Sequence, residues 1–148
     1  MIDLNLSMGP CPVCCGVLSA VSEEKEVRIG RRSARVMDDF GRCADCGEAF
    51  YAPGQMDATL RRASEAIRRE EGLLSSEAVR EIRGKLGLTQ RAFEKLLGVG
   101  PKTVVRWERG SVFQNRSTDS LLRVLDALPE SARFLGRLHR VTLRGDPP

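Results

Sequence analysis

The 148-residue sequence has few aromatic residues and a single histidine, and both shortages restrict what it can do. Phe, Trp and Tyr make up 5% of the chain, which excludes a large aromatic core. With one histidine, His139, and no glycine-rich phosphate loop, the chain lacks the residue sets on which most enzyme sites depend. We therefore predict a protein that is not an enzyme and has no catalytic residues.

Long apolar runs are also missing. No segment approaches the ~20 apolar residues that a membrane-spanning helix needs. The first six residues, MIDLNL, contain neither a basic segment nor a long apolar stretch, so they do not look like a secretion signal. We expect a cytoplasmic protein without a membrane partner.

The net charge of +4 is unevenly distributed along the chain. Residues 1–74 contain 10 Lys/Arg and 12 Asp/Glu, whereas residues 75–148 contain 14 and 8. The first half is therefore slightly acidic and the second half clearly basic. This asymmetry indicates two modules with different partners. The positive charge of the second module fits either binding to nucleic acid or an ordinary solvated surface.

All five cysteines lie within the first 46 residues, and four of them form two C-x2-C pairs. Cys11 and Cys14 are separated from Cys43 and Cys46 by the 28 residues 15–42. Four thiolates at such spacing are typical of a closed structural zinc site, with each sulfur ~2.3 Å from the metal. Zinc would also stabilise a module of ~50 residues that is too small to depend on its core alone. We predict structural Zn²⁺ bound by these four cysteines.

The cysteines could also form disulfides, a redox C-x-x-C motif or an iron site. Disulfides suit a secreted chain with an even number of cysteines, and a redox C-x-x-C needs a βαβ pattern around it. Neither condition is met here, but an iron site uses the same four ligands and stays open. Cys15 is expected to be a spare thiol, although it could compete with Cys14 as a ligand.

Hydrophobic periodicity predicts a β-rich first module and a helical second one, hence an α+β protein. Alternation over residues 23–40 predicts a hairpin that turns at residues 30–33, and residues 48–52 predict a short strand. Between Gln55 and Glu71 the period becomes helical, with Gly72 as the C-cap. The inward stripe of this helix is expected to comprise Met56, Leu60, Ala63 and Ile67. The predicted organisation is a zinc-binding module (1–54), a connecting helix and hinge (55–74) and a DNA-binding domain (75–148) that starts with a serine cap.

Residues 88–110, LTQRAFEKLLGVGPKTVVRWERG, predict two short helices joined by a glycine-containing turn. Thr89 is the expected N-cap of the first helix, and Pro101 the first residue of the second. Trp107 is expected in the core, and Glu108 is expected to pair with Arg80 or Arg83. Such a pair of helices has the geometry that places the second one in the major groove of DNA.

This segment resembles the helix-turn-helix of the Cro/repressor-like (Xre-type) family, through its Leu-Thr-Gln start and its Arg-Trp-Glu-Arg-Gly end. The resemblance implies that Gln90 contacts a phosphate and that the outer face of the second helix faces bases. Arg106 suits guanine best, because one guanidinium can donate to both O6 and N7. The expected DNA contacts are Gln90 at a phosphate and Lys102, Thr103 and Arg106 at bases or nearby phosphates. The segment that follows adds Gln114, Asn115 and Arg116, which either contact the phosphate backbone or form an ordinary polar loop.

Two further helices are expected after this segment. Ser117 is the predicted N-cap of a helix over residues 118–128, and Pro129-Glu130-Ser131 is predicted to break the chain. Ala132, Leu135 and Leu138 suggest a last helix. Its exposed apolar residues are the expected homodimer surface, because readers of this kind bind paired half-sites as dimers.

Residues 9–130 as a whole resemble the MqsA-type (YgiT-type) antitoxin family. The resemblance comes from the CPVC start, Cys-x-x-Cys-Gly-Glu at 43–48, the LTQ…RWERG segment and the helix that follows. It implies an N-terminal module that binds metal and a cognate toxin, usually an RNA-cleaving one. It also implies a dimeric C-terminal module that represses the operon of a type II toxin–antitoxin system. Lys102 stands where better-known members have a DNA-reading asparagine, whereas Arg106 is retained. The alternative is a stand-alone zinc-containing Xre-type transcription regulator without a toxin.

Overall fold

The computed structural model describes residues 9–147, and the chain divides into two compact units. Unit 1 comprises residues 1–66 and unit 2 residues 67–148. The boundary falls inside helix α1 (Gln55–Glu71), so that this helix contributes residues to both units. Among the described residues, no helix combines the length and apolar character needed to cross a bilayer.

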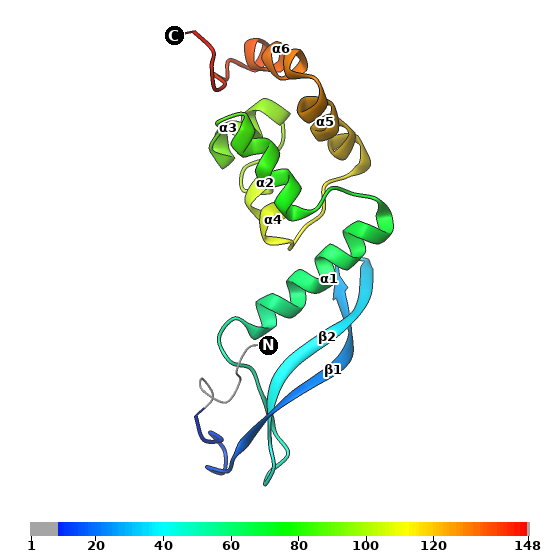
Figure 1. Ribbon diagram of the computed structural model, residues 1–148, viewed down its shortest axis with the longest axis vertical. Coiled ribbons are helices and arrows are strands. Elements are labelled where there is room, and N and C mark those ends of the chain that lie inside the picture. Colours follow the sequence, from blue (N-terminus) through cyan, green and yellow to red (C-terminus); the bar gives the residue numbers. More distant parts are fainter. Residues whose placement is uncertain (1–8, 148) are drawn as a thin grey trace. The chain divides into compact units, whose positions relative to one another are not determined.

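Unit 1 contains an antiparallel three-stranded sheet in the order β1-β2-β3 (Figure 1). The strands are β1 (Leu18–Ile29), β2 (Arg32–Cys43) and β3 (Ala49–Phe50). The predicted hairpin is confirmed, but its turn has two residues, Gly30 and Arg31, instead of four, since Ile29 already pairs with Arg32. Gly30 has a φ of +62°, the conformation that two-residue hairpin turns reserve for glycine.

The first part of α1 is held to the sheet by polar contacts. Asp38, 2% exposed, accepts hydrogen bonds from the Tyr51 hydroxyl at 2.6 Å and the Thr59 hydroxyl at 2.8 Å. Burial raises the pKa of Asp38, but these hydrogen bonds and the one from Lys25 outweigh it and lower the pKa overall. Met56, expected in the inward stripe, is 65% exposed, and the polar side chain of Thr59 is buried on the helix instead.

The end of α1 lies in unit 2 and is fixed there by Arg68, which is 1% exposed. Its guanidinium donates to the backbone oxygens of Leu74 and Trp107, both at 3.0 Å, and to Oε1 of Gln114 at 2.9 Å. Gly72, with a φ of +70°, ends the helix as predicted. The hinge expected in the connection that follows Gly72 is therefore tied to the helical unit by a buried arginine.

Unit 2 is helical and has a continuous apolar core. After α1 come α2 (Ser76–Lys85), α3 (Gln90–Leu97), α4 (Thr103–Arg109), α5 (Arg116–Ala127) and α6 (Pro129–His139). The core includes Val79, Phe93, Val104 and Leu122, all 0% exposed. Each helix of α2 to α5 thus contributes to one packed interior.

Two predicted helix boundaries in unit 2 were wrong. Asn115, not Ser117, caps α5, because its side chain accepts the backbone N–H of Thr118 at 2.8 Å. Pro129 begins α6 rather than breaking the chain, since a proline costs nothing at the first helical position. The α5–α6 connection is therefore one residue, Leu128.

Candidate metal centre and nucleic-acid interface

The register of the hairpin brings the two C-x2-C pairs together. Leu18, at the start of β1, pairs with Cys43, at the end of β2. The first pair precedes β1 and the second begins at the last residue of β2, so both lie at the same end of the sheet. A backbone hydrogen bond from Ala44 N to Val17 O, 3.2 Å long, continues this pairing past the strands. The long gap between the pairs is thus the length of the hairpin.

The four sulfur atoms form a compact group whose members all lie within 4.8 Å of one another. Sγ of Cys11 is 3.6 Å from Sγ of Cys46, and Sγ of Cys14 is 3.4 Å from Sγ of Cys43. A tetrahedral centre with ~2.3 Å metal–sulfur bonds has sulfur–sulfur edges of roughly 3.8 Å. The cluster therefore fits a single tetrahedral metal ion, and these four cysteines are positioned to hold one.

The electrostatics of the thiols also favour a cation at their centre. Hydrogen bonding from the backbone N–H of Cys46 lowers the pKa of Cys43 to about 7. The pKa of Cys14 is raised to about 12, because its contacts with the neighbouring thiols and its burial outweigh a backbone hydrogen bond from Gly16 that lowers it. Four thiolates this close repel one another, and a metal ion removes that conflict since each sulfur then faces positive charge.

The two cysteine turns, residues 11–16 and 43–48, have the same backbone pattern. Cys15 N donates to Cys11 O at 2.8 Å, as Gly47 N does to Cys43 O at 3.0 Å. Cys11 N in turn donates to Gly16 O and Cys43 N to Glu48 O, each at 2.9 Å.

In this comparison Cys15 corresponds to Gly47 of the second turn and not to a metal-ligand position. Its φ of +61° matches the +77° of Gly47, so it occupies the left-handed position of its turn. It is exposed, and its sulfur does not belong to the four-sulfur group. Cys14 is thus the ligand candidate of the first turn, as the C-x2-C spacing predicts.

Gly16 permits the close approach of the two turns. A Cβ atom at this position would lie 2.9 Å from Sγ of Cys43 and would collide with the carboxylate of Asp45. Glycine is the residue type that leaves this space free. Neither Gly16 nor the left-handed position of Cys15 was identified from the sequence, although the glycine after each cysteine pair was a visible signal.

In unit 2, helix α4 is fixed at both ends by buried carboxylates. At its start, Oε1 of Glu94, from α3, accepts the backbone N–H of Val104 at 3.1 Å. At its end, Glu108 accepts a hydrogen bond from Nε of Arg83 at 2.6 Å and forms an ion pair with Arg80 at 3.6 Å. The expected ion pair of Glu108 is confirmed with both arginines. The role of Glu94 was missed, because a glutamate on an exposed-looking helix face gives no sequence signal for a cap on another helix.

The same carboxylate holds Gln90. Nε2 of Gln90 donates to Oε2 of Glu108 at 2.8 Å, so the side chain expected at a phosphate lies against α4 and is half-buried. Burial raises the pKa of Glu108, but hydrogen bonds from Arg83 and Gln90 and the charges of Arg83 and Arg80 lower it overall. Glu108 is therefore an ionised anchor for the packing of α2, α3 and α4.

The outer side of α4 carries the exposed residues predicted to face DNA. Arg106 and Lys102 are exposed and Thr103 is partly exposed, whereas Val104 and Trp107 are buried at 0% and 3%. The helix begins at Thr103, two residues later than predicted, because Lys102 adopts a left-handed φ of +61°. Lys102 therefore precedes the helix rather than lying on its face.

The three residues expected at the phosphate backbone differ in their availability. Arg116 is exposed at the first position of α5. Asn115 is exposed, with its side-chain oxygen occupied as the cap of α5. Gln114 is 1% exposed and donates to Leu74 O and to Asp119, both at 3.0 Å. The expected phosphate contact of Gln114 does not fit this burial, since its amide completes the network around Arg68.

Comparison with known proteins gives two matches. Residues 9–134 match the model of a family described as the antitoxin component of a bacterial toxin–antitoxin system, MqsA. The chain is also similar to Antitoxin MqsA of Escherichia coli (strain K12), with 29% identity over 124 residues. That alignment covers 81% of this chain and 94% of the relative.

Proposed function

The chain belongs to the MqsA family of antitoxins, and from this premise we propose that it neutralises a toxin through unit 1 and represses its own operon through unit 2. The antitoxin assignment and the existence of a toxin partner follow from the family. The operon-repressing activity, the type II mechanism and the division of labour are the proposal. The observation that supports the DNA-binding part of this proposal is the outward side of α4, where Arg106 is exposed on a helix that is anchored at both ends.

The metal in the four-cysteine cluster is, in this proposal, Zn²⁺ with a structural role. Four sulfur ligands leave no position for water, so the ion supplies folding energy rather than chemistry. Both cysteine turns donate the backbone N–H groups that ligand thiolates favour. Elemental analysis of the purified chain should find zinc in stoichiometric amount, and iron in its place would correct the metal assignment.

The toxin, in our proposal an RNA-cleaving protein, is bound by unit 1. In the described part of the chain, β1 pairs with β2 alone, so its outer edge offers unpaired backbone groups to a partner strand. Close to this strand is a cavity of about 350 Å³, lined among others by Val27, Tyr51 and Met56. An open strand edge beside exposed apolar side chains is suited to a protein partner.

Helices α3 and α4 are, in this proposal, the helix-turn-helix that binds operator DNA. Arg106 donates to a guanine in the major groove, with Lys102 and Thr103 at neighbouring bases or phosphates. Arg116 reaches the phosphate backbone, and Asn115 and Gln90 contact it with the groups that their intramolecular hydrogen bonds leave available. The positive charge of residues 75–148 supports the sequence-independent part of this affinity.

A homodimer completes the proposed DNA reader. Helices α5 and α6 and their connection expose four apolar side chains, 43% to 60% accessible: Val124, Leu128, Phe134 and Leu138. An apolar surface of this kind is suited to a second copy of the chain, and two copies place two reading helices on paired half-sites. The cytoplasm, where operator DNA is found, is the proposed location.

Arg106→Ala tests the DNA assignment. We expect its affinity for the chain's own upstream region to fall by roughly 1–3 kcal/mol, because a bidentate contact with guanine is lost. Gel shifts with the upstream fragment and an unrelated duplex separate the specific from the sequence-independent part. Arg61→Ala is the matched control, since it removes the same charge from an exposed position of unit 1. Equal loss in both variants, or none in Arg106→Ala, would contradict the assignment.

A further inference from the structure

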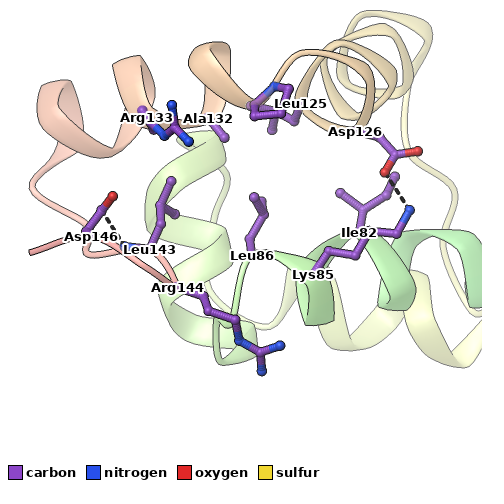
Figure 2. Close-up of a pocket in the computed structure, with 11 residues that line it drawn as sticks. Ile82, Lys85, Leu86, Leu125, Asp126, Ala132, Arg133, Leu143, Arg144 and Asp146 are labelled. Atoms are coloured by element: carbon purple, nitrogen blue, oxygen red, sulfur yellow. Dashed lines mark hydrogen bonds and ion pairs between the residues drawn. The ribbon is translucent and has the colours of Figure 1, made fainter.

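Unit 2 contains a cavity that the proposed DNA and dimer functions do not use. It has a volume of about 230 Å³ and lies between the end of α2, the α5–α6 connection and the C-terminal segment (Figure 2). Apolar side chains form its floor, among them Ile82, Leu86, Leu125 and Leu143. In Figure 2 these side chains point towards the centre of the cavity, and charged residues surround them. We call this space the tail cavity.

One wall of the tail cavity is the segment from Val141 to Asp146, which follows α6. It lies beyond residue 134, where the match to the antitoxin family ends. The segment is nevertheless built into the fold: Val141 and Leu143 are 9% and 7% exposed. The family match therefore does not cover this wall of the cavity, although it covers the lining residues from α2, α5 and α6.

Two glycines permit the segment to pass so close. A Cβ atom at Gly136 would lie 2.8 Å from Val141 O, and one at Gly87 would lie 2.8 Å from Cβ of Arg144. At the second contact the backbone N–H of Arg144 donates to Leu86 O at 2.9 Å. The wall of the tail cavity is thus held by backbone contacts at both ends.

The charges around the tail cavity favour an anionic ligand. Its two carboxylates are already occupied: Asp126 accepts from Lys85 at 2.9 Å, and Asp146 accepts the backbone N–H of Leu143 at 2.9 Å. Within the described residues, the guanidinium groups of Arg133 and Arg144 have no hydrogen-bond or ion-pair partner. Figure 2 shows Arg133 beside Ala132 above the apolar floor and Arg144 below it, with the end of the Arg144 side chain directed away from the floor. The cavity thus offers an apolar interior and two available cationic groups.

We propose that the tail cavity binds a small amphipathic carboxylate, with its apolar body on the floor between α2 and α6 and its carboxylate at Arg133 or Arg144. An apolar pocket with a few convergent polar groups is the usual form of a small-molecule site. Guanidinium groups are well matched to carboxylates because they donate two parallel hydrogen bonds. The volume limits the ligand to a short aliphatic or single-ring body.

Octanoate is the probe for this proposal, titrated below its micellar range into the full-length chain and followed by calorimetry and ¹⁵N–¹H NMR. We expect saturable binding with shifts concentrated in residues 82–87, 125–133 and 141–146. Octan-1-ol keeps the apolar chain without the carboxylate and so tests the need for the charge. Inorganic phosphate is an anion without an apolar chain and so tests the need for the apolar body. Each should bind at least roughly tenfold more weakly, since each lacks one of the two interactions.

Arg133→Gln and Arg144→Gln, singly and together, identify the cationic side. At least one single variant should weaken octanoate binding about tenfold, the loss of one charged hydrogen-bonding group. Arg137→Gln is the matched control, because this residue is exposed on α6 outside the cavity and should bind octanoate as the original chain does. Unchanged binding in the double variant, shifts elsewhere in the chain or the absence of saturable binding would overturn the proposal.

Discussion

Units 1 and 2 are of similar length but differ in what holds them together. Of the buried apolar residues in the described chain, five lie in unit 1, and two of those are the proposed metal ligands Cys11 and Cys43. Fourteen lie in unit 2, twelve of them in one core cluster. Unit 2 can therefore be stabilised by burial of apolar surface, whereas unit 1 needs another source of folding energy.

Unit 1 has polar contacts in place of a large apolar core, and in our proposal a metal ion bound by its cysteine cluster. Asp38 accepts three hydrogen bonds in the interior beside α1, and the cysteine cluster joins the two ends of the hairpin. Structural zinc contributes binding free energy on the order of 10 kcal/mol, as much as the whole stability of many domains. The two units should consequently respond to opposite perturbations.

Loss of a ligand should have the largest effect. Cys43→Ser leaves three sulfur ligands, so we expect the metal to be lost and unit 1 to unfold while unit 2 keeps its structure. Metal analysis and ¹⁵N–¹H NMR of the full chain measure both outcomes. Cys15→Ser is the control and should retain the full metal content. A folded, metal-loaded Cys43→Ser protein would show that the cluster is not the stabilising element.

A core deletion should do the reverse. Phe93→Ala removes a ring that is 0% exposed, at a cost of about 3–5 kcal/mol from lost burial and the cavity that remains. We expect unit 2 to melt earlier, with the metal content of unit 1 unchanged. Val112→Ala, 42% exposed between α4 and α5 and outside the proposed dimer surface, should cost under about 0.5 kcal/mol. Loss of metal in Phe93→Ala would refute the independence of the two units.

Acid should weaken unit 2 through its buried carboxylates. The pKa of Glu108 is lowered from 4.5 and that of Asp119 from 3.8, so both contribute stability above these values. This contribution to the free energy of unfolding is lost as the pH falls below 4.5 and 3.8 and through the lowered pKa values of the folded chain. Denaturation followed by Trp107, the single tryptophan, should show a smaller decline with acid in Glu108→Gln than in the original chain. Glu70→Gln, exposed on α1, should leave the profile unchanged.

The two cysteine turns provide the smallest and most local test. Cys15 and Gly47 both adopt a left-handed backbone conformation. This conformation costs a residue with a side chain roughly 1 kcal/mol in folding free energy, whereas glycine adopts it without that cost. Cys15→Gly should therefore stabilise unit 1 by about that amount, and Gly47→Ala should destabilise it similarly. Thermal unfolding of the metal-loaded chain measures both. Opposite signs would contradict the equivalence of the turns.

Local patterns in the sequence predicted most of the fold. Alternating residues predicted the hairpin, the helical period predicted α1 with the bounds that it has, and Gly72 and Thr89 are caps as expected. The C-x2-C spacing identified all four members of the sulfur cluster. These features depend on neighbours within a few residues, or on a residue type with one dominant use.

The wrong helix boundaries and hairpin turn are local shifts, whereas the misplaced side chains are those whose partners are distant in sequence. Gln114 looked like an exposed polar residue, but Arg68, 46 positions earlier, draws it into the interior. Two further contacts were not predicted at all: Glu94 caps a helix other than its own, and Leu143 is buried beyond the end of the last helix. No local period predicts such contacts, because they are decided by the packing of whole helices.

Amide hydrogen exchange of the full-length chain, before and after removal of metal with a chelator, tests the central difference between the units most directly. We expect protection in β1 and β2 to be lost on chelation and protection in α2, α3 and α5 to persist. Protection that survives in the hairpin, or that disappears from both units together, would contradict the account.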